Sequence, residues 1–249
     1  MRNIKIVFSY DGTDYFGWQT QPGRATIQET LEKALARLTG AARVNVNASG
    51  RTDAGVHAVG QTANFYSDTR ITAGKLVPAI NAHLPSDIVI HEASDVPQSF
   101  DASRDAVSKL YRYVIHDGLV PSPFLRRYCC QSRHRLDVPA MARASRALLG
   151  RHDFRCFETE WPNRQTSVRT ILHLTVNRVG EYVWLDVEAD GFLYNMVRAI
   201  AGTLMYVGRG FWPETQVAEI VAAQDRTQAG PTAPAAGLFL MRVNYDGPD

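Results

Sequence analysis

The first half of the chain alternates strand-like and helix-like hydrophobic patterns. Residues 4–10 alternate apolar and polar positions and stop at the turn residues Asp11 and Gly12, which predicts a strand. Thr26 and Glu29 have the spacing of a capping box, and the apolar residues that follow recur at helical spacing up to Gly40, which predicts a helix. The other predicted elements are strands at 44–48, 61–66 and 88–93 and a helix at 72–82. The predicted order is β-α-β-β-α-β.

The second half has a similar order of patterns with a different sequence. Its predicted strands are residues 109–115, 171–177, 182–188 and 238–245. Its predicted helices are residues 138–149, 195–207 and 213–223. The element order recurs although the residues do not, so we interpret the chain as an architectural repeat.

We therefore expect an α+β protein built from two split β-α-β halves of the ferredoxin/RRM-like kind, residues 1–105 and 106–249. Joined edge to edge, the halves would give one long mixed, mainly antiparallel sheet with helices on one face and an open face for a ligand. The alternative is two independent small domains on a linker. No segment rich in Pro, Gly or Ser separates the halves, which favours one continuous body.

Composition indicates an ordinary globular protein. Of the 249 residues, 45% are hydrophobic and 21% are charged, and no apolar run has the length of a membrane-spanning helix. The first residues lead into a strand pattern and not into a cleavable signal peptide, so we expect a cytoplasmic protein. Cys129, Cys130 and Cys156 lack the spacing of a disulfide framework or a zinc site and are interpreted as buried thiols.

Positive charge is concentrated in one stretch although the net charge is only +2. The stretch also contains His134 and His152, and its arginines are Arg126, Arg127, Arg133, Arg135, Arg143, Arg146, Arg151 and Arg155. One interpretation is a solvated face with scattered ion pairs. The other is a phosphate-binding surface, because the planar fork of arginine suits phosphate oxygens.

Residues 48–58 form the segment with the clearest potential for chemistry. They lie between two predicted strands, and Gly50, Ala54 and Gly55 leave room for a bulky planar ligand to reach the carboxylate of Asp53. By spacing alone, an aspartate beside glycine is more often a turn former than a catalyst.

Residues 50–58, with the sequence GRTDAGVHA, resemble the catalytic loop of the tRNA pseudouridine synthase A family. Other segments resemble the family in the same order, so the resemblance spans nearly the whole chain. These segments are 9–12, 16–19, 109–113, 192–198, 202–204, 229–234 and 237–240. Two positions depart from the family pattern: Ser103 stands where many members have arginine, with Arg104 one position later, and Leu110 replaces a small or polar residue.

The resemblance implies an isomerase that converts uridine to pseudouridine in the anticodon stem-loop of tRNA, at positions 38, 39 and 40. It implies a central RNA-binding cleft, tRNA as the partner, a homodimer, no membrane association, and neither a cofactor nor a metal. Asp53 matches the family's nucleophile, and a carboxylate can attack the sugar carbon or the uracil ring and leave later. Both points of attack remain open from the residues.

The resemblance also implies roles for four further residues. Arg198 would pair with the nucleophile, and Arg51 would hold the displaced strand or the loop. Tyr111 would stack on the uracil and relay a proton, and Leu238 would close the other side of the base pocket. From the residues alone, the alternatives are a surface ion pair for Arg51, a snorkelling helix residue for Arg198, and ordinary packing for Tyr111 and Leu238.

Two other functions are compatible with parts of the pattern. A non-catalytic RNA-binding protein could use the same split β-α-β sheets without needing Asp53. A hydrolase or phosphotransferase could use a single aspartate, but the sequence has no phosphate-binding G-x-x-x-x-G-K-[ST], no H-E-x-x-H and no paired acids near it.

Overall fold

The computed structural model describes residues 1–159 and 166–246. The chain divides into two compact units. The first unit is Met1–Val107 with Leu240–Asp249, and the second is Ser108–Phe239. The last strand of the chain therefore belongs mostly to the first unit.

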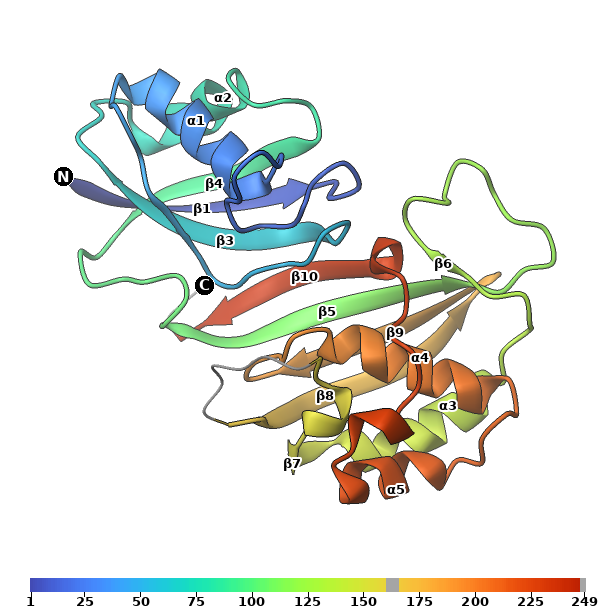
Figure 1. Ribbon diagram of the computed structural model, residues 1–249. Coiled ribbons are helices and arrows are strands. Elements are labelled where there is room, and N and C mark those ends of the chain that lie inside the picture. Colours follow the sequence, from blue (N-terminus) through green and yellow to red (C-terminus); the bar gives the residue numbers. More distant parts are fainter. Residues whose placement is uncertain (160–165, 247–249) are drawn as a thin grey trace. The chain divides into compact units, whose positions relative to one another are not determined.

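The first unit is a sheet with two helices, and Figure 1 shows the helices together on one side of its strands. The strands are β1 (Arg2–Tyr10), β2 (Val46–Ala48), β3 (His57–Ser67), β4 (Ile88–Val96) and β10 (Leu238–Tyr245), and the helices are α1 (Ile27–Thr39) and α2 (Ala73–Asn81). β1 pairs antiparallel with both β3 and β4, and β2 pairs antiparallel with β3. The predicted order β-α-β-β-α-β is confirmed.

The core of this unit follows from the sequence pattern. Ile4, Ile6 and Phe8 alternate along β1 and are fully buried. Helix α1 begins where the Thr26 hydroxyl accepts a hydrogen bond from the Glu29 amide (3.4 Å). The carboxylate of Glu29 forms an ion pair with Lys33 one turn along the helix.

The second unit has five strands and three α-helices among the described residues. The strands are β5 (Ala106–His116), β6 (Cys130–Gln131), β7 (Gly150–Asp153), β8 (Val168–Val179) and β9 (Tyr182–Ala189). The helices are α3 (Val138–Ser145), α4 (Met196–Gly208) and α5 (Gln216–Ala223), with short 3-10 turns η1 (Arg146–Leu148), η2 (Arg155–Phe157), η3 (Arg226–Gln228) and η4 (Ala235–Gly237). β5, β9, β8 and β7 pair antiparallel in that order, and β6 pairs parallel with β5.

The described strands form a ten-stranded sheet in the order β4-β1-β3-β10-β5-β9-β8-β7, with β2 beside β3 and β6 beside β5. The predicted α+β class with a long mixed, mainly antiparallel sheet is confirmed. The sequence did not predict β6 and β7, because they have only two and four residues and no apolar alternation. The helix predicted at 138–149 is shorter, because α3 ends at Ser145 and continues as the 3-10 turn η1.

The structure also bears on the cysteines and on the search for membrane-spanning helices. Cys129, Cys130 and Cys156 are free and buried, as predicted. Within residues 1–159 and 166–246, we find no helix with the length and hydropathy of a membrane span.

The segment that precedes β10 packs its backbone directly onto α4. The amide of Gly230 donates to the hydroxyl of Thr203 (2.9 Å), and the amide of Ala233 donates to the carbonyl of Arg198 (3.1 Å). A methyl group added at Gly202 would overlap with the carbonyl of Pro231. Glycine at 202 is therefore required by a close approach of two backbones.

We predict that Gly202→Ala destabilises the protein by about 1–3 kcal/mol, because the helix and the segment must move apart. Gly74→Ala in α2 is the matched control, since an added methyl group there meets no atom within 4 Å. The control should change the free energy of unfolding by less than about 1 kcal/mol. Urea unfolding measures both variants. A Gly202→Ala protein as stable as the parent would contradict the packing argument.

Candidate active site

Asp53 lies in the loop between β2 and β3 in the first unit. The loop closes as a tight turn in which the Val56 amide donates to the carbonyl of Asp53 (3.1 Å), and Gly55 adopts a φ of 77°. Thr52 is buried, Asp53 is half-buried, and Arg51 and Ala54 are exposed. The turn therefore fixes the backbone of Asp53 and leaves its side chain partly accessible.

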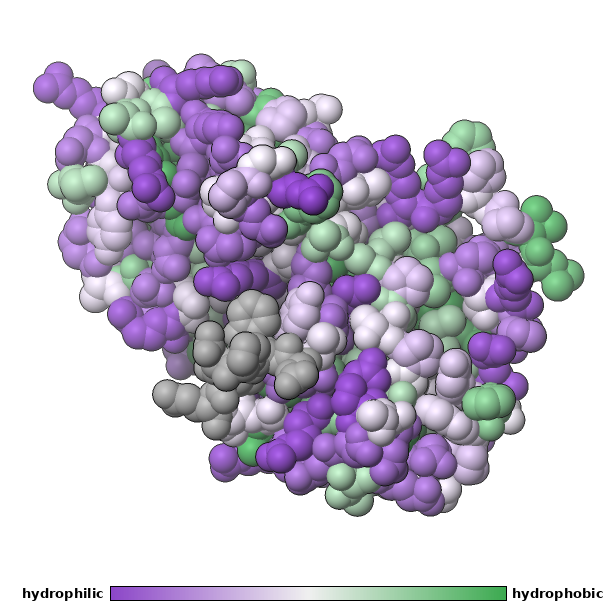
Figure 2. Space-filling view, viewed as in Figure 1, coloured by the Kyte–Doolittle hydropathy of each residue, from purple (hydrophilic) through white to green (hydrophobic). Residues whose placement is uncertain are grey.

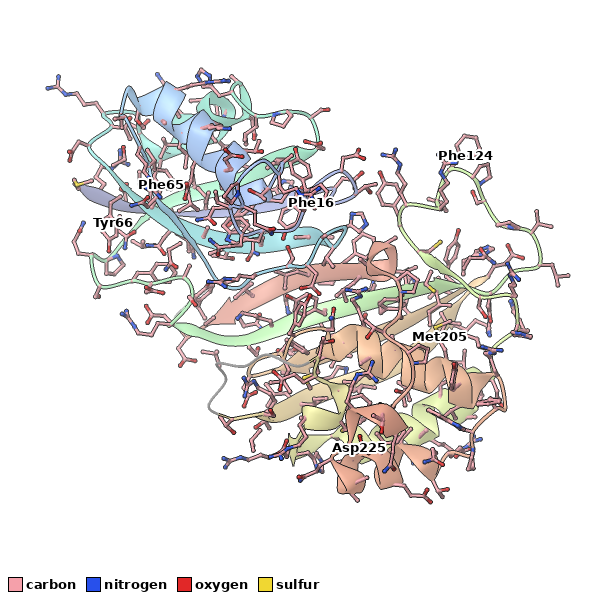
Figure 3. All side chains as sticks on the ribbon, viewed as in Figure 1. Phe16, Phe65, Tyr66, Phe124, Met205 and Asp225 are labelled. Carbon is pink, nitrogen blue, oxygen red and sulfur yellow. The ribbon has the colours of Figure 1, made fainter. Side chains whose placement is uncertain are left out.

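The turn that follows β1 holds this loop by backbone contacts. The amide of Trp18 donates to the carbonyl of Thr52 (3.0 Å), and the amide of Gly55 donates to the carbonyl of Tyr15 (3.2 Å). Gly17 lies between these contacts with a φ of 80°, and a methyl group added to it would lie 2.6 Å from the Thr52 oxygen. Phe16, labelled in Figure 3, marks the position of this turn. Only glycine allows so close an approach.

Side chains add two further contacts between the same segments. The hydroxyls of Tyr10 and Thr52 lie 2.7 Å apart in a hydrogen bond. Burial raises the pKa of Tyr10 to about 12, so the phenol is neutral at physiological pH. The amide of Gly12 donates to Nδ1 of His57 (3.1 Å). Residues on both sides of Asp53 are thus bound to the turn.

β3 fixes the start of the loop. The buried side chain of Gln61 accepts from the Ser49 hydroxyl (2.7 Å) and donates to the carbonyl of Gly50 (3.1 Å). The amide of Ser49 donates to the carbonyl of Thr62 (2.8 Å). The loop therefore has fixed contacts at its beginning, middle and end.

Tyr111 and Leu238 lie in the second unit. Tyr111 is on β5, is only 7% exposed, and makes an edge contact with the ring of Phe192 at 4.9 Å between centroids. Leu238 is 6% exposed and starts β10 directly after η4. The turn before it is held by Tyr113, whose hydroxyl donates to the carbonyl of Pro234 (2.8 Å).

Arg198 also lies in the second unit, in the first turn of α4. Its Nε donates to the carbonyl of Ala233 (2.7 Å), and its Nη1 donates to Oδ1 of Asn195 (2.7 Å). Asn195 is one of two non-glycine residues with positive φ among the described residues, at 63°. The guanidinium is thus held in a defined orientation and does not extend freely into solvent.

The structure places the predicted residues in two groups. Arg51 and Asp53 share the loop of the first unit, whereas Tyr111, Arg198 and Leu238 belong to the second. No role was predicted from the sequence for the residues that hold the loop. They are Tyr10, Gly12, Gly17, Thr52 and His57. Their motifs were visible, but the contacts join positions about 35 to 45 residues apart, which no local pattern indicates.

The arginines of the basic stretch differ in their ion pairing. Three form ion pairs, namely Arg135 with Asp117, Arg143 with Glu214 and Arg155 with Asp153. The solvated interpretation suits Arg143 and Arg155, whose partners are partly exposed, whereas Arg135 pairs with a fully buried carboxylate. Four others are exposed and appear in no ion pair of the described residues: Arg126, Arg133, Arg146 and Arg151.

The loop between β5 and β6 exposes apolar side chains beside Arg126 and Arg127. Leu119 is fully exposed, and Phe124 is 86% exposed. Figure 3 labels Phe124 on this loop, and Figure 2 shows hydrophobic atoms gathered in the same region. Between Leu119 and Tyr128, no apolar side chain of this loop is buried.

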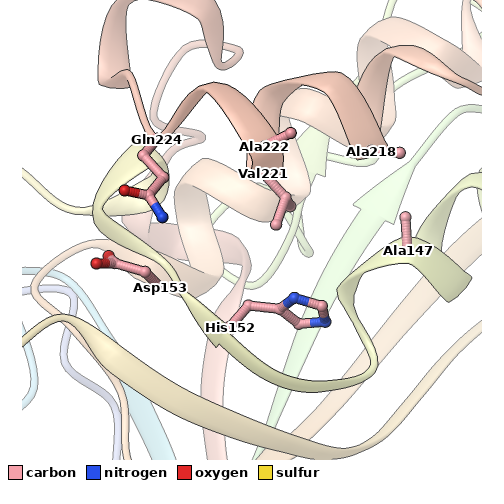
Figure 4. Close-up of a pocket in the computed structure, with 7 residues that line it drawn as sticks. All are labelled: Ala147, His152, Asp153, Ala218, Val221, Ala222 and Gln224. Carbon is pink, nitrogen blue, oxygen red and sulfur yellow. The ribbon is translucent and has the colours of Figure 1, made fainter.

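A cavity of about 450 Å³ lies between β7, η1 and α5 in the second unit (Figure 4). It is lined by Ala147, His152, Asp153, Ala218, Val221, Ala222 and Gln224. Two of its polar side chains are already engaged, since Asp153 pairs with Arg155 and the ring of His152 contacts the carbonyl of Leu149. It contains none of the predicted site residues. In the described parts of the chain, no group of three His, Cys, Asp or Glu residues could hold a metal ion.

Comparison with known proteins places the chain in a class of RNA-modifying isomerases. Residues 6–103 and 144–246 match the family model described as tRNA pseudouridine synthase. This match covers well over half of the chain, and the protein belongs to the tRNA pseudouridine synthase family.

Relatives support the assignment over the whole length. The chain is 44% identical over 245 residues to a protein named tRNA pseudouridine synthase A from Thermoanaerobacter sp. (strain X514), covering 98% of this chain and 100% of the relative. Proteins with the same name from Acetivibrio thermocellus and Pelobacter propionicus show the same identity and cover 98% of this chain and 100% of their own.

A crystal structure of a Cbf5-Nop10-Gar1 complex is a more distant match. It has a TM-score of 0.36 and 11% sequence identity, and the alignment covers 95% of this chain and 57% of the matched chain. A similarity at this level does not identify a function.

We predict that Gly17→Ala lowers the rate of pseudouridine formation by about 10²-fold, because the new methyl group must displace the backbone at Thr52 and Asp53. Gly23→Ala is the matched control. Gly23 has a similar φ of 72°, but a methyl group there meets no atom within 4 Å. Both variants should lose about 1–2 kcal/mol of stability from left-handed backbone strain. Equal rates in the two variants would contradict the positional argument.

Proposed function

We propose that this protein converts uridine to pseudouridine in the anticodon stem-loop of tRNA, at positions 38, 39 and 40, with Asp53 as the nucleophile. The observation that carries the proposal is the family loop GRTDAGVHA, in which the backbone around Asp53 is held by contacts from two other segments. Because its position is fixed and its side chain is partly accessible, Asp53 can meet a planar base without a large rearrangement.

The reaction needs one nucleophile and no redox or hydrolytic partner. The Asp53 carboxylate forms a covalent bond either to the ribose carbon or to the uracil ring, and the bond between ribose and base nitrogen breaks. The base turns and rejoins the ribose through carbon. The base carbon that forms the new bond loses a proton, and the base nitrogen released from ribose gains one. The carboxylate is then released. Atoms and electrons therefore balance within the substrate.

We propose supporting roles for residues of the second unit. Tyr111 would stack on the uracil and relay the proton, since the edge contact with Phe192 fixes the plane of its ring. Arg198 would supply the cation that keeps the nucleophile ionised, because two hydrogen bonds already orient its guanidinium. Leu238 would close the other side of the base pocket. Arg51, which is exposed, would hold the displaced strand.

The target uridine must leave its stack before it reacts, which costs on the order of a few kcal/mol. Phosphate contacts and base stacking would offset this cost. In this proposal, residues 1–105 supply the nucleophile and residues 106–249 complete the uridine pocket. The enzyme would work in the cytoplasm as a homodimer, in which one subunit grips tRNA for the other.

We expect Asp53→Asn to lower pseudouridine formation by on the order of 10⁴-fold or more, because the amide cannot act as the nucleophile. Affinity for tRNA should stay within about threefold, since the substitution changes one side chain outside the phosphate contacts. Asp68→Asn is the control, because it removes the same charge from an exposed residue of the same unit. Mass labelling of derivatised tRNA measures product, and filter binding measures affinity.

Two results would decide against the proposal. Full activity in Asp53→Asn would exclude the aspartate as nucleophile. Absence of any pseudouridine with the parent protein, together with tight RNA binding, would favour a non-catalytic RNA-binding protein.

We expect affinity for tRNA to fall as salt rises, with a slope of about −3 in log affinity against log salt if four arginines contact phosphates. The double substitution Arg146→Gln and Arg151→Gln should reduce that slope by about 1 to 2. Arg143→Gln is the control, because its guanidinium is already paired with Glu214. A flat salt dependence in the parent protein would show that the basic stretch does not bind the tRNA backbone.

A further inference from the structure

His57 is a buried titratable residue at the start of β3, four residues after Asp53. Its side chain is 2% exposed. Nδ1 of its ring faces two groups of the turn after β1: the amide of Gly12 at 3.1 Å and Oδ1 of Asp11 at 3.1 Å. The ring therefore contacts the same turn whose backbone holds the Asp53 loop.

The contacts of Nδ1 assign its protonation state. A single ring nitrogen either accepts from the Gly12 amide or donates to Asp11, but does not do both. The Gly12 N–H is aimed at Nδ1, which requires a bare nitrogen. Asp11 Oδ1 already accepts from the amide (3.0 Å) and the hydroxyl (2.6 Å) of Thr13. Nδ1 is thus an acceptor, and the ring proton of neutral His57 is on Nε2.

We propose that His57 is a positioning residue for the nucleophile, which acts by holding the Gly12 amide. This inference rests on the proposed role of Asp53. Gly12 approaches the carbonyl of Val56 so closely that no side chain would fit, so the start of the turn lies directly against the end of the catalytic loop.

A shift of the backbone at Gly12 would displace Asp53 through backbone hydrogen bonds. The turn that begins at Gly12 continues to Tyr15 and Trp18, which bind Gly55 and Thr52 on either side of the nucleophile. The carbonyl of Asp53 accepts a hydrogen bond from the amide of Val56, the residue that precedes His57 in the sequence. If the acceptor is lost, the buried Gly12 N–H is left unsatisfied and the turn can move away.

The side chain that can replace His57 follows from this geometry. The acceptor must be bonded to the carbon that follows Cβ, which is where asparagine carries its amide oxygen. His57→Asn therefore keeps an acceptor for Gly12. His57→Leu has a similar size but carries a methyl group at that position.

The test is a steady-state comparison of the two variants on tRNA. We expect His57→Leu to lower kcat about 10- to 100-fold while KM for tRNA changes less than about threefold, because the reacting groups are misplaced and the binding surface is not. His57→Asn should recover kcat to within about threefold of the parent. Unchanged kcat in a folded His57→Leu protein, equal defects in the two variants, or a change confined to KM would overturn the inference.

Nitrogen NMR of the unsubstituted protein tests the contact if the variants fail to fold. A scalar coupling between the Gly12 amide nitrogen and a bare Nδ1 supports the inference, and a protonated Nδ1 at neutral pH overturns it. This measurement does not depend on catalysis. If Asp53→Asn stays active, the nucleophile assignment fails. If Asp53→Asn is inactive and His57→Leu is fully active, only the positioning role fails.

Discussion

The constraint on which the site depends is the close approach of the turn after β1 to the loop before β3. Two backbone hydrogen bonds join these segments, from Trp18 to Thr52 and from Gly55 to Tyr15. Gly12 and Gly17 make the approach possible, because any side chain there would overlap with loop backbone. Hydrogen bonds of this kind contribute modestly to stability, but a buried donor without a partner is costly. The loop therefore has few alternative positions.

The second unit uses a related arrangement at α4. Backbone from the segment before β10 lies against the helix where Gly202 and Gly230 leave no side chain in the way. This packing brings the carbonyl of Ala233 to the guanidinium of Arg198. In both units, a contact between two backbones thus positions a residue that we propose as part of the site.

Much of the fold could be predicted from the sequence because its main elements are long and periodic. The alternation along β1 and the spacing of the α1 residues identify their elements and their buried faces. β6 and β7 could not be predicted, since they form by pairing with a neighbouring strand and have no local sequence pattern. Asp53 became a candidate nucleophile by family resemblance, because spacing alone favoured a turn former.

The residues that hold Asp53 were not predictable in the same way. Tyr10 and Thr52 are 42 positions apart, and Gly12 and His57 are 45 apart, so their contacts become visible only when the strands are paired. The glycines carry the one local clue, because a glycine in a polar turn indicates either a positive φ or a close approach.

The most direct test of the proposed function is position mapping of pseudouridine in unmodified tRNA incubated with the purified protein. The proposed function predicts new pseudouridine only in the anticodon stem-loop, at positions 38, 39 and 40, with no release of free uracil. Pseudouridine confined to other positions, free uracil, or no change in the tRNA would contradict it.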